Sequence, residues 1–374
     1  MKNDCVREIP LSDTNALTEF IVLSRQLLGK YPLFVSEFDS DILRQLTGKS
    51  AFTKDVEISL WVASDENQDV ARCAAMINPR YQEAKNEKVG FISHFAAPPG
   101  CESFVRAMLE QAEGWLRERG IQRIIAPFNC HALLGMGFLT TAYDEEPVMN
   151  PGWNPPYYPA CFLQSGYAPT YPLLVYTIDL SSPVYQAALE RAGTVTSFHV
   201  RPLDKKRWES ELEIFRRIIN ENFDKEWEWH PITQDEWLEF FDDMKPLVDP
   251  QQMLIAVVHG EPAGVCIGFP NWNPLLRGFH GKTGLWQLLK FLLLGRRYKD
   301  AGLVFAAVDP KYRGMGIGPV LEVSVCHRYE QLGLKQVHGY IVNEDNYRSR
   351  KVIESIGGVG RVQYYVYDKK IISD

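Results

Sequence analysis

A glycine-rich stretch over residues 308–323, VDPKYRGMGIGPVLEV, contains the residues best suited to chemistry. Arg313 precedes three alternating glycines, Gly314, Gly316 and Gly318. Glycines let backbone N–H groups turn toward an anion and let the anion approach closely, while a helix N-terminus adds partial positive charge. Pro319 suits the first turn of a helix. The spacing therefore predicts a phosphate site where a strand ending at Val308 meets a helix over 319–332.

Two other kinds of phosphate loop do not fit this stretch. The sequence has no G-x-x-x-x-G-K-[ST], and the glycine spacing at 314, 316 and 318 is not G-x-G-x-x-G. A dinucleotide fold would also need an early βαβ unit, whereas here the motif follows an antiparallel meander. Nucleotide hydrolysis and hydride transfer are therefore disfavoured.

Composition narrows the class of protein further. A net charge of -7 disfavours nucleic acid as a partner, because phosphate backbones need a surplus of Lys and Arg. The seven cysteines are scattered, with no C-x-x-C pair and no His at zinc-ligand spacing, so we expect no metal and a reducing compartment. The N-terminus lacks the apolar segment of a signal peptide. The apolar run 285–294 is about half of the roughly 20 residues that a membrane span needs. We expect a soluble, cytoplasmic protein.

The elements that must position the glycine loop repeat along the 374 residues. Apolar periodicity and turn residues predict the same order in both halves: strand, two helices, three strands, helix, strand and a variable tail. The first half ends with a strand over about 173–180, and the second half ends with a strand over 362–367. We therefore expect two domains, 1–185 and 186–374, with a helical insertion at about 271–302 in the second.

These residues resemble a known family. Arg313 to Gly318 matches R-x-x-G-x-G, the coenzyme A pyrophosphate loop of the GNAT (Gcn5-related N-acetyltransferase) superfamily, and it lies between the strand and helix where that fold places it. The segments 343–346, 357–358 and 364–369 also look like the end of the fold. The whole chain is similar to bacterial tandem-GNAT proteins. The resemblance implies an α+β, three-layer fold of two GNAT-like domains, each a mixed, mostly antiparallel sheet flanked by helices.

The resemblance also implies an activity and a cosubstrate. Acetyl-CoA, or another acyl-CoA, would donate its acyl group, in the first instance acetyl, directly to the amine of a small molecule or peptide. One strand N–H would stabilise the oxyanion of the attacked thioester. The residues implied in coenzyme binding are Ala306 and Val308 on the strand, Arg313, Gly314, Met315, Gly316, Ile317 and Gly318 in the loop, and Asn346.

The catalytic groups are less clear, since many family members carry a tyrosine seven residues after that asparagine and here the position is Ile353. Tyr340 is a substitute candidate for the general acid. The loop 224–231, DKEWEWHP, lies where the family lines the acceptor site. It offers Glu226 and His230 as candidate bases and Trp227 and Trp229 as candidate substrate contacts.

The first half departs further from the family pattern. Its matching loop, Ala96-Ala97-Pro98-Pro99-Gly100-Cys101-Glu102, has no R-x-x-G-x-G, and two prolines remove backbone donors. We expect it to bind no coenzyme and to supply part of a substrate cleft, lined by residues 129–131 and 150–158. The protein would then be a monomer acting as a pseudo-dimer, or a homodimer.

Two alternatives remain open from the sequence. One is a protein that binds or senses acyl-CoA without catalysis, and the other is an aminoacyl or long-chain acyl transferase with paired GNAT-like domains. The insertion carries an apolar stripe, Leu285, Leu288, Leu289 and Leu292. Packing of this stripe against a domain is favoured over contact with an acyl chain or a membrane surface.

Overall fold

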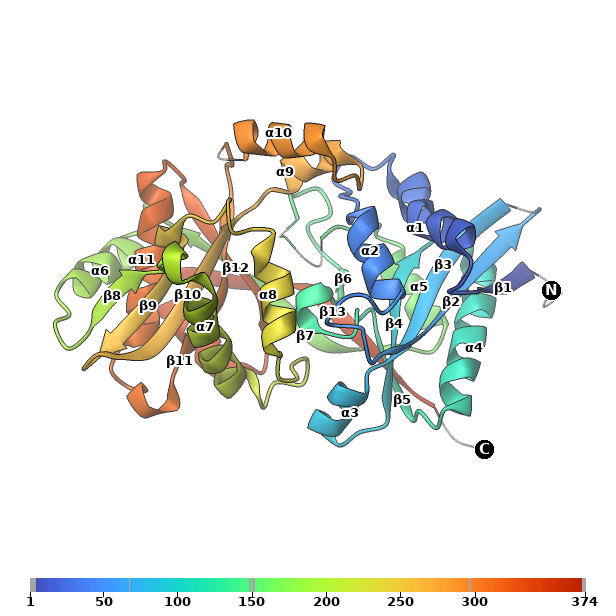
Figure 1. Cartoon of the computed structure of the whole chain (residues 1–374), viewed down its shortest axis with the longest axis horizontal. Coiled ribbons are helices and arrows are strands. Elements are labelled where there is room, and N and C mark those ends of the chain that lie inside the picture. The colour runs from blue at the N-terminus through green and yellow to red at the C-terminus, as the bar shows by residue number, and fades with distance from the viewer. Residues whose placement is uncertain (1–4, 67, 148, 150–151, 296, 372–374) are drawn as a thin grey trace. The chain divides into compact units, whose positions relative to one another are not determined.

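Both halves of the chain build a mixed sheet with helices, as the sequence predicts (Figure 1). The structure is a computed structural model that describes residues 5–66, 68–147, 149, 152–295 and 297–371. Internal contacts divide the chain into two units. Unit 1 comprises Met1–Pro172, Asn273–Phe291 and Gln363–Asp374, and unit 2 comprises Leu173–Trp272 and Leu292–Val362.

The sheet of unit 1 has the strand order β1-β2-β3-β4-β5-β13. Neighbours are antiparallel except for the parallel pair β4 and β5. Helix α1 packs against β3 and β4, and α4 packs against β2 and β3. The elements are β1 Val6–Ile9, α1 Thr14–Leu28, α2 Asp39–Leu46, β2 Glu57–Asp65, β3 Gln68–Ile77, α3 Pro79–Lys85, β4 Val89–Ala96, α4 Glu102–Glu118, β5 Arg123–Ala126, β6 Phe138–Leu139 and α5 Tyr158–Gln164.

The sheet of unit 2 has the strand order β7-β12-β11-β10-β9-β8, and β11 and β12 are its parallel pair. Helix α7 packs against β10 and β11, while α11 packs against β9, β10 and β11. The elements are β7 Ala168–Asp179, α6 Pro183–Gly193, β8 His199–Pro202, α7 Trp208–Phe223, α8 Gln234–Asp242, β9 Met253–Val258, β10 Glu261–Pro270, β11 Ala301–Val308, α11 Ile317–Gln331, β12 Gln336–Asn343 and α12 Tyr347–Ser355. Strand β13, Gly358–Lys370, begins in unit 2 and from Gln363 onward belongs to unit 1.

The last strand of each half of the sequence pairs with a strand from the other half. Strand β7 pairs with β12 from Gln336 opposite Asp179 to Asn343 opposite Leu173. Strand β13, at the end of the chain, pairs with β5 from Tyr367 opposite Ala126 to Lys370 opposite Arg123. The units therefore interleave along the chain, which differs from the continuous domains 1–185 and 186–374 expected from the sequence.

The insertion between β10 and β11 contains two helices, α9 Asn273–Leu276 and α10 Leu285–Leu294. Its two ends are tied together, because Asn271 donates its backbone N–H to the Asp300 carbonyl at 2.8 Å and its side-chain amide to the Asp300 carboxylate at 3.1 Å. Short 3₁₀ turns complete the chain at Ala132–Leu134, Lys205–Arg207, Pro250–Gln252, Arg277–Phe279 and Pro310–Tyr312.

Close packing of α11 on the sheet depends on glycines in β10. A Cβ at Gly264 would lie 2.8 Å from Ile317 Cγ2, and one at Gly268 would lie 2.6 Å from Val325 Cγ1. Real carbon atoms do not approach this closely, so larger residues would push α11 outward. The two glycines therefore fix where α11 lies over the sheet and where its N-terminus meets the end of β11.

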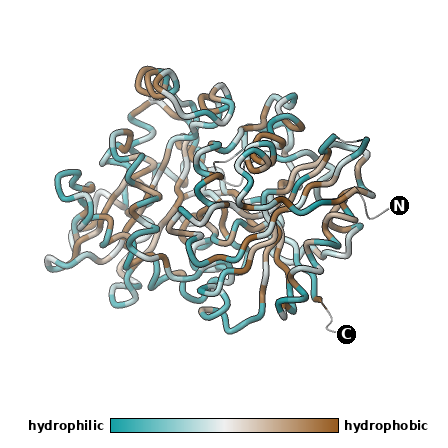
Figure 2. Tube along the Cα trace, turned by 45° about the vertical axis from the view of Figure 1, so that its right-hand side comes forward, coloured by the Kyte–Doolittle hydropathy of each residue, from teal (hydrophilic) through white to brown (hydrophobic). Residues whose placement is uncertain are grey.

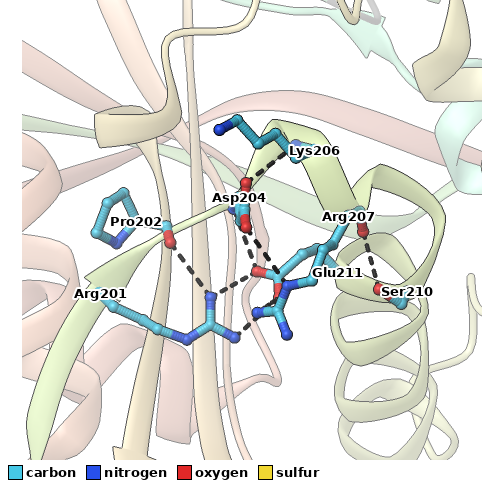
Figure 3. Close-up of polar contacts among 7 residues, drawn as sticks. All are labelled: Arg201, Pro202, Asp204, Lys206, Arg207, Ser210 and Glu211. Atoms are coloured by element: carbon cyan, nitrogen blue, oxygen red, sulfur yellow. Dashed lines mark hydrogen bonds and ion pairs between the residues drawn. The ribbon is translucent and has the colours of Figure 1, made fainter.

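A buried carboxylate joins β8 to α7 (Figure 3). Glu211 is only 1% exposed, and it accepts hydrogen bonds from Arg201 at 2.5 and 3.0 Å and from Arg207 at 2.8 Å. The Asp204 backbone N–H also donates to it, at 3.3 Å. Burying a carboxylate is costly unless it is paired and hydrogen-bonded, and these donors satisfy it.

Candidate active site in unit 2

Strands β11 and β12 pair for only a short distance. Their parallel ladder covers Gly302 with His338 and Leu303 with Gly339. Beyond this point a cavity of about 70 Å³ lies between the strands. Its lining comes from β11, β12, α7 and the loop after it, α11 and α12: Phe223, Glu228, Leu303, Val304, Phe305, Ala306, Glu322, Gly339, Tyr340, Ile341, Val342, Asn343, Asn346, Ser349 and Ile353.

Backbone irregularities on both strands occur at this cavity. Ile267 of β10 is paired with Phe305 of β11, and the next residue, Gly268, is paired with Leu303. Val304 is therefore an extra residue on β11 and forms a bulge. On β12, the register shifts between Gly339 and Val342, and Ile341 adopts a positive φ of 50°. Bulges reorient backbone N–H and C=O groups. The chain therefore presents backbone polar groups where the two strands separate.

The predicted phosphate loop has the backbone that anion binding requires. Gly314 and Gly316 have φ values of 86° and 77°, and a Cβ at either position would meet nothing within 4 Å. Gly316 is the N-cap of α11, and no side chain caps this end of the helix. N–H groups at an uncapped helix N-terminus can bind an anion. Open space beside them leaves room for a phosphate, and helix α11 begins two residues earlier than the sequence predicted.

Two neighbours hold this loop in place. The Arg313 guanidinium donates to the Asn222 amide oxygen on α7 at 3.1 Å. A Cβ at Gly318 would lie 3.3 Å from Val352 on α12, so glycine permits close packing between α11 and α12. Met315 is 36% exposed, whereas Ile317 is buried. Gly314 and Gly316 thus form the open turn, while Arg313 and Gly318 contact the neighbouring helices.

The other predicted coenzyme residues lie near the cavity. Ala306 lines it, and Val308 lies at the end of the same strand. Asn346 also lines it and is the N-cap of α12, where its side-chain oxygen accepts the Ser349 N–H at 3.1 Å. Ile353, which replaces the family tyrosine, is 4% exposed and lines the same cavity. The position that would carry a tyrosine is therefore an apolar wall.

Tyr340 is part of the cavity wall as well. The residue is 5% exposed, and its ring lies over Gly302, where an added Cβ would come within 2.4 Å of the ring. The ring is nearly parallel to that of His338, at 15° between planes and 6.4 Å between centroids. Gly302 therefore makes the space that Tyr340 fills beside the last paired residues of β11 and β12.

The loop 224–231 contributes a residue other than those predicted. Among the described residues, Glu228 lines the cavity, while Glu226, Trp227, Trp229 and His230 are absent from its lining. Glu228 is 7% exposed and accepts a hydrogen bond from the Asn343 amide at 3.2 Å. Trp229 packs against Phe223 and Phe305 and donates to Asn220 at 3.1 Å. Trp229 thus supports the loop that places Glu228.

Glu322 is a cavity residue that the sequence did not single out. It lies on α11, one residue after Leu321, and is 4% exposed. One of its carboxyl oxygens, Oε2, is buried and has no hydrogen-bond partner among the described residues. Burial raises its pKa from 4.5 to about 8. At neutral pH this carboxyl group is therefore largely protonated and can donate a proton. The only sequence signal was an acidic residue in an otherwise apolar stretch of helix.

Unit 1 replaces the phosphate loop with an anchored turn. The Ala97 N–H donates to the Tyr158 hydroxyl at 3.0 Å, and the Tyr157 hydroxyl donates to the Ala97 carbonyl at 2.8 Å. The sequence analysis expected residues 129–131 and 150–158 to line a cleft, and some of these residues line a cavity within this unit. A cavity of about 400 Å³ is lined in part by Asn129, Gly152, Trp153, Asn154 and Tyr158. Asn150 and Pro151 lie outside the described residues.

Metal binding and membrane crossing each require a recognisable arrangement of residues. In the part of the chain that the structure describes, no group of three or more His, Cys, Asp or Glu side chains is arranged to hold a metal ion. Among the same residues, no helix has both the length and the apolar character that crossing a bilayer requires.

Comparison with known proteins agrees with this geometry. Residues 212–357 match the acetyltransferase (GNAT) family. Among curated proteins, a bacterial ceramide synthase from Caulobacter vibrioides is 26% identical over 97% of this chain and 97% of its own length. Protein YghO from Escherichia coli is 24% identical over 96% of this chain and 93% of its own.

Solved structures show the same fold over nearly the whole chain. A tandem GNAT protein from the clavulanic acid biosynthesis pathway matches with a TM-score of 0.57 and 12% identity, covering 99% of this chain and all of that one. A protein from Enterococcus faecalis V583, described as a probable N-acyltransferase, matches with a TM-score of 0.52 and 12% identity, covering 98% and 73%. Residues 212–357 therefore match the GNAT acetyltransferase family, and the whole chain has the fold of tandem GNAT proteins.

Proposed function

We propose that unit 2 is an acyl-CoA-dependent N-acyltransferase. One observation carries the proposal: the open glycine turn at the N-terminus of α11 comes one 3₁₀ turn after β11, and residues 303–306 of β11 line the cavity. A pyrophosphate held at Arg313 to Gly318 would direct the pantetheine arm along Ala306 and Val308 toward that cavity. Asn346 would border the arm from α12.

The reaction would proceed by direct attack within this cavity. The amine nitrogen forms a bond to the thioester carbon, and the C–S bond breaks to release coenzyme A as its thiolate. A backbone N–H near the Val304 bulge would stabilise the oxyanion formed on attack. Positioning of the two reactants supplies much of the remaining rate enhancement.

Two carboxyl groups in the cavity would manage the protons. Glu228 would accept the proton that the amine loses on attack, held in orientation by Asn343. Glu322, buried on α11, would protonate the departing thiolate in place of the tyrosine that Ile353 replaces. Tyr340 is the alternative donor, since it lines the same cavity.

The name of a relative supports a proposal for the acceptor class. A ceramide is the amide between a fatty acyl group and the amine of a long-chain amino alcohol, and the Caulobacter relative is named a ceramide synthase. We therefore propose a long-chain acyl-CoA donor and a long-chain amino alcohol acceptor. The family resemblance alone implies acetyl transfer, and acetyl-CoA therefore serves as the comparison donor in the test.

The test measures thiol release and amide formation by the purified protein. Palmitoyl-CoA and acetyl-CoA are each paired with sphinganine and with ethanolamine, which have the same amino alcohol head and differ in chain length. We expect thiol release coupled to amide product, fastest with palmitoyl-CoA and sphinganine. Coenzyme binding without turnover on any pair would contradict the enzyme proposal and favour a binding or sensing protein, which the apolar Ile353 would suit. Faster turnover with acetyl-CoA would contradict the proposed donor.

A further inference from the structure

Helix α10 is rich in hydrophobic residues, and its trace is brown at the top of Figure 2. Six side chains make up what we call the α10 face: Leu285 (73% exposed), Trp286 (81%), Leu288 (53%), Leu289 (41%), Leu292 (56%) and Leu293 (75%). No residue of this helix is buried. The sequence expectation that the leucine stripe packs against a domain is therefore wrong.

The helix is held in place from its opposite side. Phe291 packs against Phe279, with ring centroids 6.5 Å apart, and the Lys290 ammonium lies 5.9 Å from the centroid of the same Phe279 ring. The segment before the helix is also anchored, since the Gly281 carbonyl accepts the Asp39 N–H at 2.8 Å and Arg277 pairs with Glu146 at 2.7 Å. The α10 face is thus exposed on a supported helix.

Charge around the helix has one sign. Residues 272–299 contain six Lys or Arg and no Asp or Glu, although the whole chain has a net charge of -7. Lys282, Lys290, Arg297 and Lys299 are exposed, while Arg296 lies outside the described residues. A basic segment in an acidic protein attracts an anionic surface. It disfavours a second copy of this chain as the occupant, because two such segments would repel each other.

We propose that the α10 face binds the surface of an anionic lipid bilayer. The leucines would enter the boundary between headgroups and acyl chains, Trp286 would lie at the headgroup level, and the flanking lysines and arginines would contact lipid phosphates. With ten residues, α10 is too short to cross a bilayer and would lie along its surface. This proposal does not depend on the acyl transfer reaction, because its readout is binding.

The test is flotation of the full-length protein with vesicles. We expect binding to vesicles of phosphatidylcholine with 30% phosphatidylglycerol, weaker binding to phosphatidylcholine alone, and release at high salt. The double variant L288E/L292E should bind at least tenfold more weakly. Its matched control, L163E/L332E, makes the same charge change at two other exposed leucines and should bind like wild type.

Other outcomes would overturn the proposal. These are absence of wild-type flotation on anionic vesicles, equal binding to neutral and anionic vesicles, or equal losses in both double variants. Concentration-dependent dimers that L288E/L292E abolishes would show that a second copy occupies the face. Circular dichroism and thermal melting of each variant establish that it is folded, so a loss of flotation reports on the surface alone.

Discussion

Glu322 shows at the scale of a single residue how burial changes chemistry. Its carboxyl group lines the cavity between β11 and β12, and burial raises its pKa to about 8. A surface glutamate of ordinary pKa would be ionised at neutral pH and could not supply a proton. The sequence could not identify Glu322, because local pattern does not reveal which face of α11 meets the gap between two strands.

The variant E322Q tests its proposed role in proton transfer. We expect kcat to fall at least about tenfold, equivalent to about 1.4 kcal/mol, with unchanged acyl-CoA affinity. Wild-type turnover should decline as pH rises through about 8, since the protonated form is then lost. The variant should lack this decline. Initial rates between pH 6 and 9.5 measure both effects, and an unchanged pH profile in E322Q would rule out this role.

The same substitution has a stability consequence of known sign. The folded pKa of Glu322 lies above its ordinary value of 4.5, so the folded state retains a proton that the unfolded state loses. The contribution of this group to the free energy of unfolding therefore decreases as the pH rises from about 4.5 to about 8. At pH 8, E322Q should be more stable than wild type by roughly 1–3 kcal/mol, and the difference should shrink toward pH 5. Urea unfolding at both pH values measures it.

Glu211 gives a second prediction at this scale. E211A removes the buried carboxylate that Arg201 and Arg207 share, and should lower the free energy of unfolding by about 1–3 kcal/mol. The control is E213A on the same helix, because Glu213 and Arg216 form a partly exposed pair whose loss should cost less than about 1 kcal/mol. Equal losses in the two variants would show that burial of Glu211 is unimportant.

At the scale of elements, the turn from β11 into α11 was the most predictable part of the site. Alternating glycines encode positive φ locally, so their spacing predicted the open loop at 314 and 316 before any packing was known. The sequence analysis did not predict the separation of β11 from β12. The bulge at Val304 and the positive φ of Ile341 depend on pairing with β10 and β7, which no local pattern specifies.

Charge reversal at the loop tests its predicted ligand. In G316E, the side chain would enter the open space beside the α11 N-terminus, so acyl-CoA affinity should fall at least about 30-fold, or 2 kcal/mol. The control G333E has the same kind of backbone, with φ of 91° and nothing within 4 Å of the added Cβ, at the other end of α11. Calorimetric titration should find G333E close to wild type. Equal affinity in both variants would mean that the loop holds no phosphate.

At the scale of the whole molecule, the sequence predicted the class of fold and the repeated order of elements, but not which sheet each last strand joins. Strand β7 is the last strand of the first half yet pairs with β12, and β13 is the last strand of the second half yet pairs with β5. Both are ordinary β sequences, and their hydrogen-bond partners lie far away in sequence. Pairing of this kind is set by tertiary contacts and leaves no local signal.

Separated halves test the interleaving of the units. The fragment 1–185 lacks the strand that pairs with β5, and the fragment 186–374 lacks β7. We expect neither fragment alone to melt cooperatively, whereas the two fragments produced together should associate and recover a cooperative transition. Circular dichroism and size-exclusion chromatography measure this. A cooperative melt of either fragment alone, near the transition of the full chain, would contradict the expectation.

The position of β13 also constrains when the protein can fold during its synthesis. Strand β5 obtains its antiparallel partner from residues 367–370, which are synthesised after all of unit 2. Until then the β5 edge presents unpaired backbone groups to other nascent chains, a known route to aggregation. Unit 1 is begun before unit 2 but completed after it, so the yield of folded protein should depend on chaperones that cover the waiting edge.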